Sequence, residues 1–211
     1  YRMMEMVDTE VGTVFQAWEN SRYADNTIFI FTADHGEMLM EHNETKKGGA
    51  MEAACRVPLL VIGPDIRAGI CDTTQISGTT DVTATILDYA SIEPMPEMHG
   101  TTSLRPALEA DQERLKDYVV SESYYLPLSA CKRTVYFDDL KVICDRHDHK
   151  FKVYNFMDDK YELNNLAESV AGQAAILKAE SHLREWAKMH QPCDRILKAP
   201  RMLEGGSKMS V

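Results

Sequence analysis

Two neighbouring residues, Asp34 and His35, are the strongest candidates for chemistry in this sequence. They follow the apolar run Ile28 to Phe31, whose β-branched and aromatic side chains predict a strand buried on both faces. Open α/β sheets bind ligands just beyond the carboxyl ends of their strands, which is where this pair falls. A carboxylate beside an imidazole can supply two metal ligands, and Gly36 permits a sharp turn that leaves room for an incoming group. Two ligands rarely hold an ion alone, so the sequence predicts half of a metal site.

The elements around this pair predict an α/β fold. Apolar residues three or four positions apart predict an amphipathic helix from about Tyr1 to Asn20, ahead of the strand. A second buried strand is predicted at Val57 to Ile62, before Gly63 and Pro64. This helix–strand order suits a crossover in a mostly parallel sheet.

A short helix and a loop are predicted next. Thr80 and Asp81 are expected to cap the helix. Its predicted apolar side consists of Val82, Ile86, Leu87 and Tyr89. Prolines then mark Ser91 to Gly100 as a loop.

The pattern changes near Asp117, where short strand candidates replace the longer elements. Four of them, separated in part by short turns, predict an antiparallel meander at residues 118–123, 133–137, 140–144 and 151–156. A helix is predicted at 168–189, with Ile176, Ala179, Leu183 and Trp186 on one stripe. We therefore expect residues 1–116 to form the C-terminal part of a large mixed sheet flanked by helices. Residues 117–190 would form a small antiparallel sheet with a packed helix, and 191–211 a loose tail.

Composition excludes some classes of protein. The 211 residues are 44% hydrophobic, which is enough for a sizeable core, and their formal net charge of −10 argues against a nucleic-acid binder. Five cysteines without a CxxC pair fit neither a disulfide scaffold nor a zinc finger. No apolar run approaches the roughly 18 residues of a membrane span, and no signal peptide is present. The chain starts without Met, inside a helical pattern, so we expect a piece of a longer protein.

Several motifs together resemble the sulfatase family of the alkaline-phosphatase-like superfamily, in its type I, formylglycine-dependent class. They follow one another in the family's order, as Asp25-Asn26-Thr27, Thr32-Ala33-Asp34-His35-Gly36-Glu37-Met38-Leu39, Glu41-His42, Lys47-Gly48 and Glu52-Ala53-Ala54-Cys55-Arg56-Val57-Pro58-Leu59. Weaker matches continue at Thr80 to Tyr89 and His99 to Leu108, and a close one at Tyr154 to Ala167.

The resemblance implies a sulfate ester hydrolase. In that family a calcium ion, or alternatively magnesium, is held partly by an aspartate and its neighbour at the positions of Asp34 and His35. A hard cation prefers oxygen, which makes Asp34 the firmer ligand. Lys47 matches the family's sulfate-contacting lysine and is the candidate catalytic residue. Together with the ion, it would stabilise charge that develops during sulfate transfer. His42 is a candidate substrate-binding residue at the rim of the site.

The family pattern is incomplete in this sequence. The family nucleophile is a formylglycine made from Cys or Ser in the motif C/S-x-P/A-x-R, which these residues lack. Cys55-Arg56-Val57-Pro58 holds similar letters in the wrong order, and the family's amino-terminal aspartate pair, lysine and histidine also have no counterpart. We expect a longer parent protein to hydrolyse sulfate esters and this chain alone not to do so.

Plainer interpretations stay open for several residues. Asp34 and His35 could form an ordinary turn, His42 could support its loop, and Arg56 is expected to be a structural anchor. The His-x-His at 147–149 predicts a solvated hairpin corner, and His99 lies in a loop that could border a cleft.

Two other functions remain. One is a phosphonate or phosphate ester hydrolase, or a metal-dependent mutase, of the same superfamily; the other is a non-catalytic, decayed or glycan-binding protein. The expected ligand is a sulfated small molecule or glycan, with neither nucleic acid nor a membrane span involved. The resemblance implies a secreted, periplasmic or lysosomal location.

Overall fold

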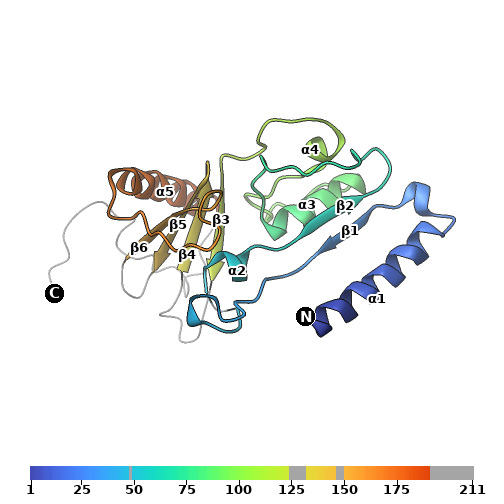
Figure 1. The fold of residues 1–211 in the computed structure, drawn as a ribbon. Coiled ribbons are helices and arrows are strands. Elements are labelled where there is room, and N and C mark those ends of the chain that lie inside the picture. The colour runs from blue at the N-terminus through green and yellow to red at the C-terminus, as the bar shows by residue number, and fades with distance from the viewer. Residues whose placement is uncertain (48, 124–131, 146–149, 191–211) are drawn as a thin grey trace.

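The computed structural model describes residues 1–47, 49–123, 132–145 and 150–190. Within these residues a four-stranded sheet and a two-stranded ribbon lie in different parts of the molecule (Figure 1). In chain order the elements are α1 (Arg2–Glu19), η1 (Ala24–Asn26), β1 (Phe29–Thr32), η2 (Glu41–Asn43), α2 (Glu52–Cys55), β2 (Leu59–Ile62), α3 (Thr79–Tyr89), α4 (Arg105–Glu109), β3 (Tyr118–Ser123), β4 (Lys132–Phe137), β5 (Leu140–Asp145), β6 (Phe151–Asn155) and α5 (Val170–Met189).

The four-stranded sheet is the predicted antiparallel meander, in the order β3-β4-β5-β6. Helix α5 covers one face (Figure 1) and is capped by Ser169, whose hydroxyl accepts a hydrogen bond from the Gly172 amide at 3.0 Å. The apolar side chains between sheet and helix form one core, which contains Val135, Phe137, Val142, Val153, Ala175, Ile176, Ala179 and Leu183. Three of the four stripe residues predicted for the helix are therefore in the core.

The opposite face of this sheet packs against Met38 and against residues 50–54, which include part of α2. Ile143 and Tyr154 form a second apolar cluster with Met38, Ala50, Met51 and Ala54. Both faces are therefore covered, which explains why four consecutive β5 residues, 141–144, are buried.

The ribbon of β1 and β2 differs from the prediction. Both strands exist, but they pair antiparallel, with Phe29 opposite Ile62 and Thr32 opposite Leu59. Neither strand is buried on both faces, since Leu59 is 39% and Leu60 50% exposed. A two-stranded ribbon leaves both outer edges unpaired among the described residues, and it has too little neighbouring structure to bury two faces.

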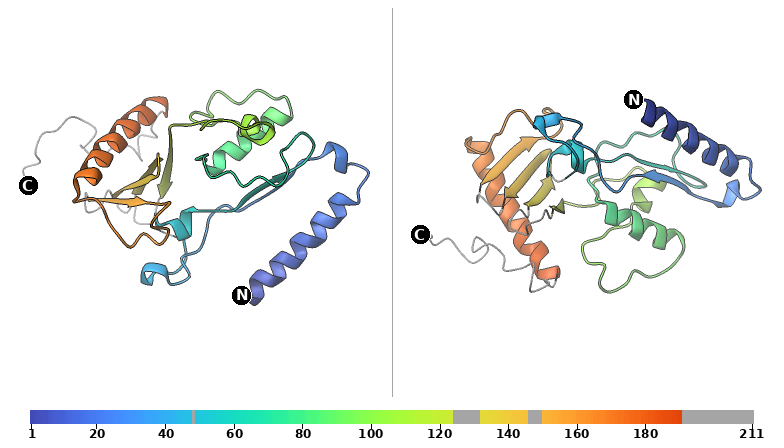
Figure 2. Two further views of the ribbon diagram at one scale, coloured as in Figure 1. Left: turned by 45° about the horizontal axis from the view of Figure 1, so that its top comes forward. Right: turned by 90° about the horizontal axis from the view of Figure 1, so that it is seen from below.

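Helix α1 forms where the spacing predicts it, but it has no buried residue. Met4, Val7 and Val14 are each more than half exposed. Only its last turns pack, through the rings of Phe15 and Trp18 against Phe29. Figure 2 shows the helix beside the ribbon and away from the four-stranded sheet. Its amphipathic pattern thus has little to pack against in the described part of the chain.

Helix α3 begins at Thr79, two residues earlier than a cap at Thr80 implies. Gly78 is the capping residue, and the buried Asp81 carboxylate accepts its amide hydrogen at 2.9 Å. The predicted apolar side is wrong, because Asp81, Ala84 and Thr85 are buried whereas Ile86 is 51% exposed. The helix packs through polar contacts instead: the Thr85 hydroxyl accepts the Leu104 amide hydrogen at 2.9 Å.

Two further properties concern the described residues only. None of their helices is both long and apolar enough to cross a membrane. Among the described cysteines, Cys55 and Cys71 are free thiols. The predicted tail at 191–211 lies outside the described residues, and the predicted domain division near Asp117 stays a prediction.

Candidate functional site

The predicted site residues lie in the connection between β1 and α2. β1 ends at Thr32, so Asp34 and His35 do follow the carboxyl end of a strand. Gly36 then passes against α2, and its amide donates a hydrogen bond to the Ala54 carbonyl at 2.8 Å. A Cβ at Gly36 would lie 2.0 Å from the Ala53 carbonyl oxygen. This close approach requires glycine, so its role is backbone contact as well as turn formation.

His35 and Lys47 are brought into direct contact. The His35 Nδ1 lies 2.8 Å from the Gly36 carbonyl oxygen, which can only accept, so this nitrogen carries the proton. The unprotonated Nε2 then accepts a hydrogen bond from the Lys47 ammonium at 2.5 Å. Asp34 Oδ2 is 3.4 Å from the same Nε2. Asp34, His35 and Lys47 therefore form one polar group.

The intervening loop explains how Lys47 reaches His35 across twelve positions. The Met38 amide bonds to the Lys46 carbonyl and the Met40 amide to the Glu44 carbonyl, both at 2.9 Å. These bonds fold the chain back on itself. The fully buried Met38 side chain anchors the base of the loop in the second apolar cluster.

His42 contacts a distant segment of the chain. Its Nε2 donates to the Tyr161 carbonyl at 3.0 Å, across 119 positions. This contact suits the loop-supporting role left open by the sequence. Substrate binding by His42 stays a prediction.

The donor set fits part of a divalent-cation site. The Asp34 side chain is 86% exposed and offers two carboxylate oxygens, which suit a hard cation. His35 is less suited, because its available nitrogen already accepts from Lys47. Among the described residues, no three His, Cys, Asp or Glu side chains gather as a metal-holding group. Asp34 thus fits as one ligand, and the roles of Asp34 and His35 in metal binding stay predictions.

Cys55 lies in α2 and is partly buried. Burial raises the pKa of its thiol, against the opposing effect of the Lys141 ammonium. A raised pKa keeps the group as the less nucleophilic thiol at neutral pH. Its thiol chemistry therefore fits a structural role for Cys55 better than that of a nucleophile.

The other histidine candidates do not join this group. His99 is exposed, and its carbonyl accepts a hydrogen bond from His190 Nε2 at 3.2 Å. His147 and His149 lie outside the described residues.

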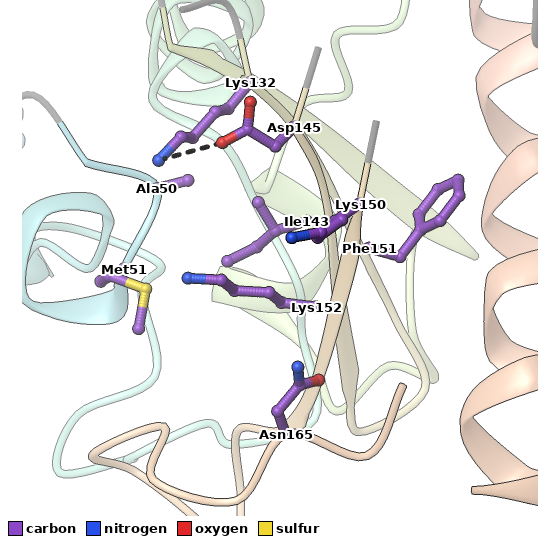
Figure 3. Close-up of a pocket in the computed structure, with 9 residues that line it drawn as sticks. All are labelled: Ala50, Met51, Lys132, Ile143, Asp145, Lys150, Phe151, Lys152 and Asn165. Atoms are coloured by element: carbon purple, nitrogen blue, oxygen red, sulfur yellow. Dashed lines mark ion pairs between the residues drawn. The ribbon is translucent and has the colours of Figure 1, made fainter. Parts of the chain in front are cut away.

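A small cavity of about 90 Å³ lies between the four-stranded sheet and Ala50 and Met51 (Figure 3). Three lysines border it, namely Lys132, Lys150 and Lys152. Lys132 is 3.5 Å from the Asp145 carboxylate, and Figure 3 shows Lys152 extending toward Met51. Ala50, which borders the cavity, comes three residues after Lys47, and the lining combines these lysines with the Asp145 carboxylate. Sequence reasoning missed it, and the alternating Lys150 and Lys152 were its one visible signal.

The chain is similar to known proteins of one family. Residues 1–92 match the family model described as Sulfatase. Arylsulfatase K of Bos taurus is 28% identical over 183 residues, covering 79% of this chain and 32% of the relative. Choline-sulfatase of Rhizobium meliloti (strain 1021) is 31% identical over 171 residues, covering 79% of this chain and 32% of the relative. The chain thus spans about a third of the length of these curated relatives.

Solved structures are similar in fold. One protein, crystallised with its substrate D-glucosamine-2-N,6-O-disulfate, superposes with a TM-score of 0.78 at 26% identity, covering 91% of this chain and 40% of that one. A phosphonate monoester hydrolase of Agrobacterium radiobacter gives 0.75 at 24% identity, covering 89% and 40%. The predicted α/β, alkaline-phosphatase-like fold class is confirmed by these likenesses.

Proposed function

Because this chain belongs to the sulfatase family, we propose that it supplies part of the active site of an enzyme that hydrolyses sulfate esters. The observation that carries the proposal is the contact between Lys47 and His35 inside the segment that matches the family. An exposed loop lysine is ordinarily free to move, whereas the His35 nitrogen here gives the ammonium a defined position.

Lys47 would bind the sulfate group of the substrate. Its ammonium can stabilise negative charge on the sulfate oxygens, and more so as charge builds up in the transition state. His35 would hold this ammonium until substrate arrives. The formylglycine nucleophile would come from a segment outside these 211 residues, since the sequence contains no matching motif.

A calcium or magnesium ion would supply Lewis-acid stabilisation when bound. Asp34 would be its oxygen ligand from this chain, and the remaining ligands would come from elsewhere. His35 would join the ion only by releasing Lys47.

The substrate would be a sulfated small molecule or glycan. The substrate named for the similar solved structure carries two sulfate groups. The lysine-bordered cavity beside Ala50 and Met51 supports a ligand with a second anionic group. We also propose the secreted, periplasmic or lysosomal location that the family resemblance implies.

A phosphonate ester hydrolase is the second candidate. A phosphonate monoester hydrolase shares the fold, and at 24% identity that likeness concerns the fold alone. A non-catalytic protein that binds sulfated ligands would use the same lysines without turnover.

The test is hydrolysis by the full-length polypeptide that contains this sequence, with 4-nitrophenyl sulfate and a 4-nitrophenyl phosphonate as substrates. We expect faster turnover of the sulfate and none by the 211-residue chain alone. Lys47→Ala should lower kcat/KM by roughly 100-fold, the loss typical of one oxyanion-stabilising donor. Lys46→Ala is the matched control, since this neighbouring lysine is also exposed and should matter little. Faster phosphonate turnover would favour the second candidate, and binding without turnover would favour a non-catalytic protein.

A further inference from the structure

A buried charge cluster joins the candidate site to the four-stranded sheet. At its centre is Lys141 of β5, whose side chain is fully buried. Its ammonium lies 2.8 Å from Glu52 Oε1 in α2 and 2.7 Å from Glu162 Oε1 in the segment between β6 and α5. The Tyr136 hydroxyl also donates to Glu52 Oε1 at 2.8 Å. Buried charges are costly unless paired, so this cluster fixes the distances between three separate segments.

Glu162 makes a second contact that concerns backbone rather than charge. Its Oε2 accepts the Glu52 amide hydrogen at 2.7 Å. Glu52 is the first residue of α2, and amides in the first turn of a helix have no partner within the helix. Glu162 therefore caps α2 from 110 positions away along the chain.

The backbone of Glu162 is strained for this contact. Its φ is +53°, a left-handed conformation that is unfavourable for residues other than glycine. The side chain is only 2% exposed, although Oε1 lacks a partner with hydrogen-bond geometry and meets Lys141 as a charge contact. Such a costly conformation persists only where the surrounding contacts determine it.

The segment between β6 and α5, which contains Tyr161 and Glu162, contacts the candidate site at two places. On one side Glu162 caps α2, whose Ala54 carbonyl accepts the Gly36 amide hydrogen at 2.8 Å, directly after His35. On the other side the carbonyl of Tyr161 accepts from His42, inside the loop that leads to Lys47. Two adjacent residues thus hold both the start and the middle of the segment 35–47.

We propose that Glu162, paired with Lys141, is a positioning residue that holds the His35–Lys47 group in place through α2 and Gly36. A role in catalysis rests on the proposed function, but the mechanical coupling between Glu162 and Gly36 does not. This role also explains part of the Tyr154 to Ala167 motif, which the site itself does not use.

Amide hydrogen exchange of the 211-residue chain, followed by NMR, tests the coupling. In Glu162→Ala we expect the Gly36 and Glu52 amides to exchange at least tenfold faster, while the amides between β4 and β5 keep their protection. Glu162→Gln keeps an acceptor for Glu52 but loses the charge, so it should have a smaller effect at the same two amides. Glu168→Gln is the matched control, because this exposed residue lies in the same connection.

Two results would overturn the proposal. One is unchanged Gly36 exchange in both Glu162 variants; the other is equal acceleration of all amides, which indicates a purely global role. If Glu162→Ala does not fold, Glu162→Gln decides between local and global acceleration.

Turnover by the full-length polypeptide provides the catalytic readout. Glu162→Gln should lower kcat about tenfold with little change in KM, since loss of position affects the reacting geometry more than substrate capture. A wild-type polypeptide without sulfatase activity would refute the proposed function and leave the exchange result intact. Normal kcat in Glu162→Gln, with a working wild type, would refute the positioning role.

Discussion

The four-stranded sheet with α5 and the ribbon with α1 differ in how far they bury their apolar side chains. The sheet and α5 enclose their own core, in which Val135, Val153 and Ala179 are completely buried. The ribbon and α1 contain no buried residue at all. Yet the residues predicted to do chemistry lie in the connection between the two ribbon strands, not in the sheet. The candidate site therefore depends for its rigidity on a part of the chain that contributes none of its predicted reactive groups.

That rigidity comes from the contacts between the two regions, which we call the join. Met38, within the candidate site, and Ala54, after it in α2, pack against Ile143 and Tyr154 of the sheet. Lys141 adds the charged contact to Glu52. Substitutions in the core of the sheet should consequently lower the free energy of unfolding most. Substitutions at the contacts between the two regions should mainly disturb the geometry of the candidate site.

Removing a core side chain of the sheet should have the largest effect on the free energy of unfolding. Phe137 is 1% exposed, so Phe137→Ala should lower the free energy of unfolding by about 3–5 kcal/mol. Val7 of α1 is 58% exposed, and Val7→Ala should change it by no more than about 0.5 kcal/mol. Chemical denaturation followed by circular dichroism measures both. Similar losses in the two variants would mean that α1 is buried against another part of the protein.

Substitutions at two glycines compare the candidate site with α1 more sharply. Gly36→Ala would place a Cβ 2.0 Å from the Ala53 carbonyl, so α2 must shift, at a cost of about 1–3 kcal/mol. Gly12→Ala in α1 meets nothing within 4 Å and should stabilise the helix by up to about 1 kcal/mol. Opposite signs in thermal denaturation are the expected result. A neutral Gly36→Ala variant would contradict the close packing of the site against α2.

Local patterns were sufficient to predict the sheet but not the join. The short strand candidates and turns in residues 118–156 predict four strands, and neighbouring strands in a meander pair without distant information. The contact of Gly36 with Ala54 and the capping of α2 by Glu162 could not be foreseen, because spacing carries no signal for pairs 18 and 110 positions apart.

The family resemblance, rather than spacing, assigned His35 and Lys47 to one site. The structure brings the two side chains into contact, and their roles in that site stay predictions. Burial of the ribbon was overestimated, because apolar strand residues indicate what a strand could pack against and not whether that neighbour is present.

Acid should weaken the sheet with α5 by a smaller amount, through His182. This ring stacks on Tyr118 with centroids 4.3 Å apart and also meets Phe137. Burial lowers its pKa, and the Lys178 ammonium lowers it further. The folded state thus binds a proton less readily than the unfolded state, whose histidine titrates at about 6.5. As the pH falls through that value the unfolded state is protonated first, so the free energy of unfolding declines until the folded pKa is passed.

His182→Phe keeps the aromatic stacking and removes the titrating group. Between pH 7 and pH 5 its unfolding free energy should fall less than that of the wild type, by denaturant titration at each pH. Other titrating groups contribute equally to both proteins, so only the difference between the two curves matters. Parallel curves for His182→Phe and wild type would show that the buried ring accepts its proton as easily when folded as when unfolded, and the packing of α5 on β3 and β4 would then be looser than these contacts indicate.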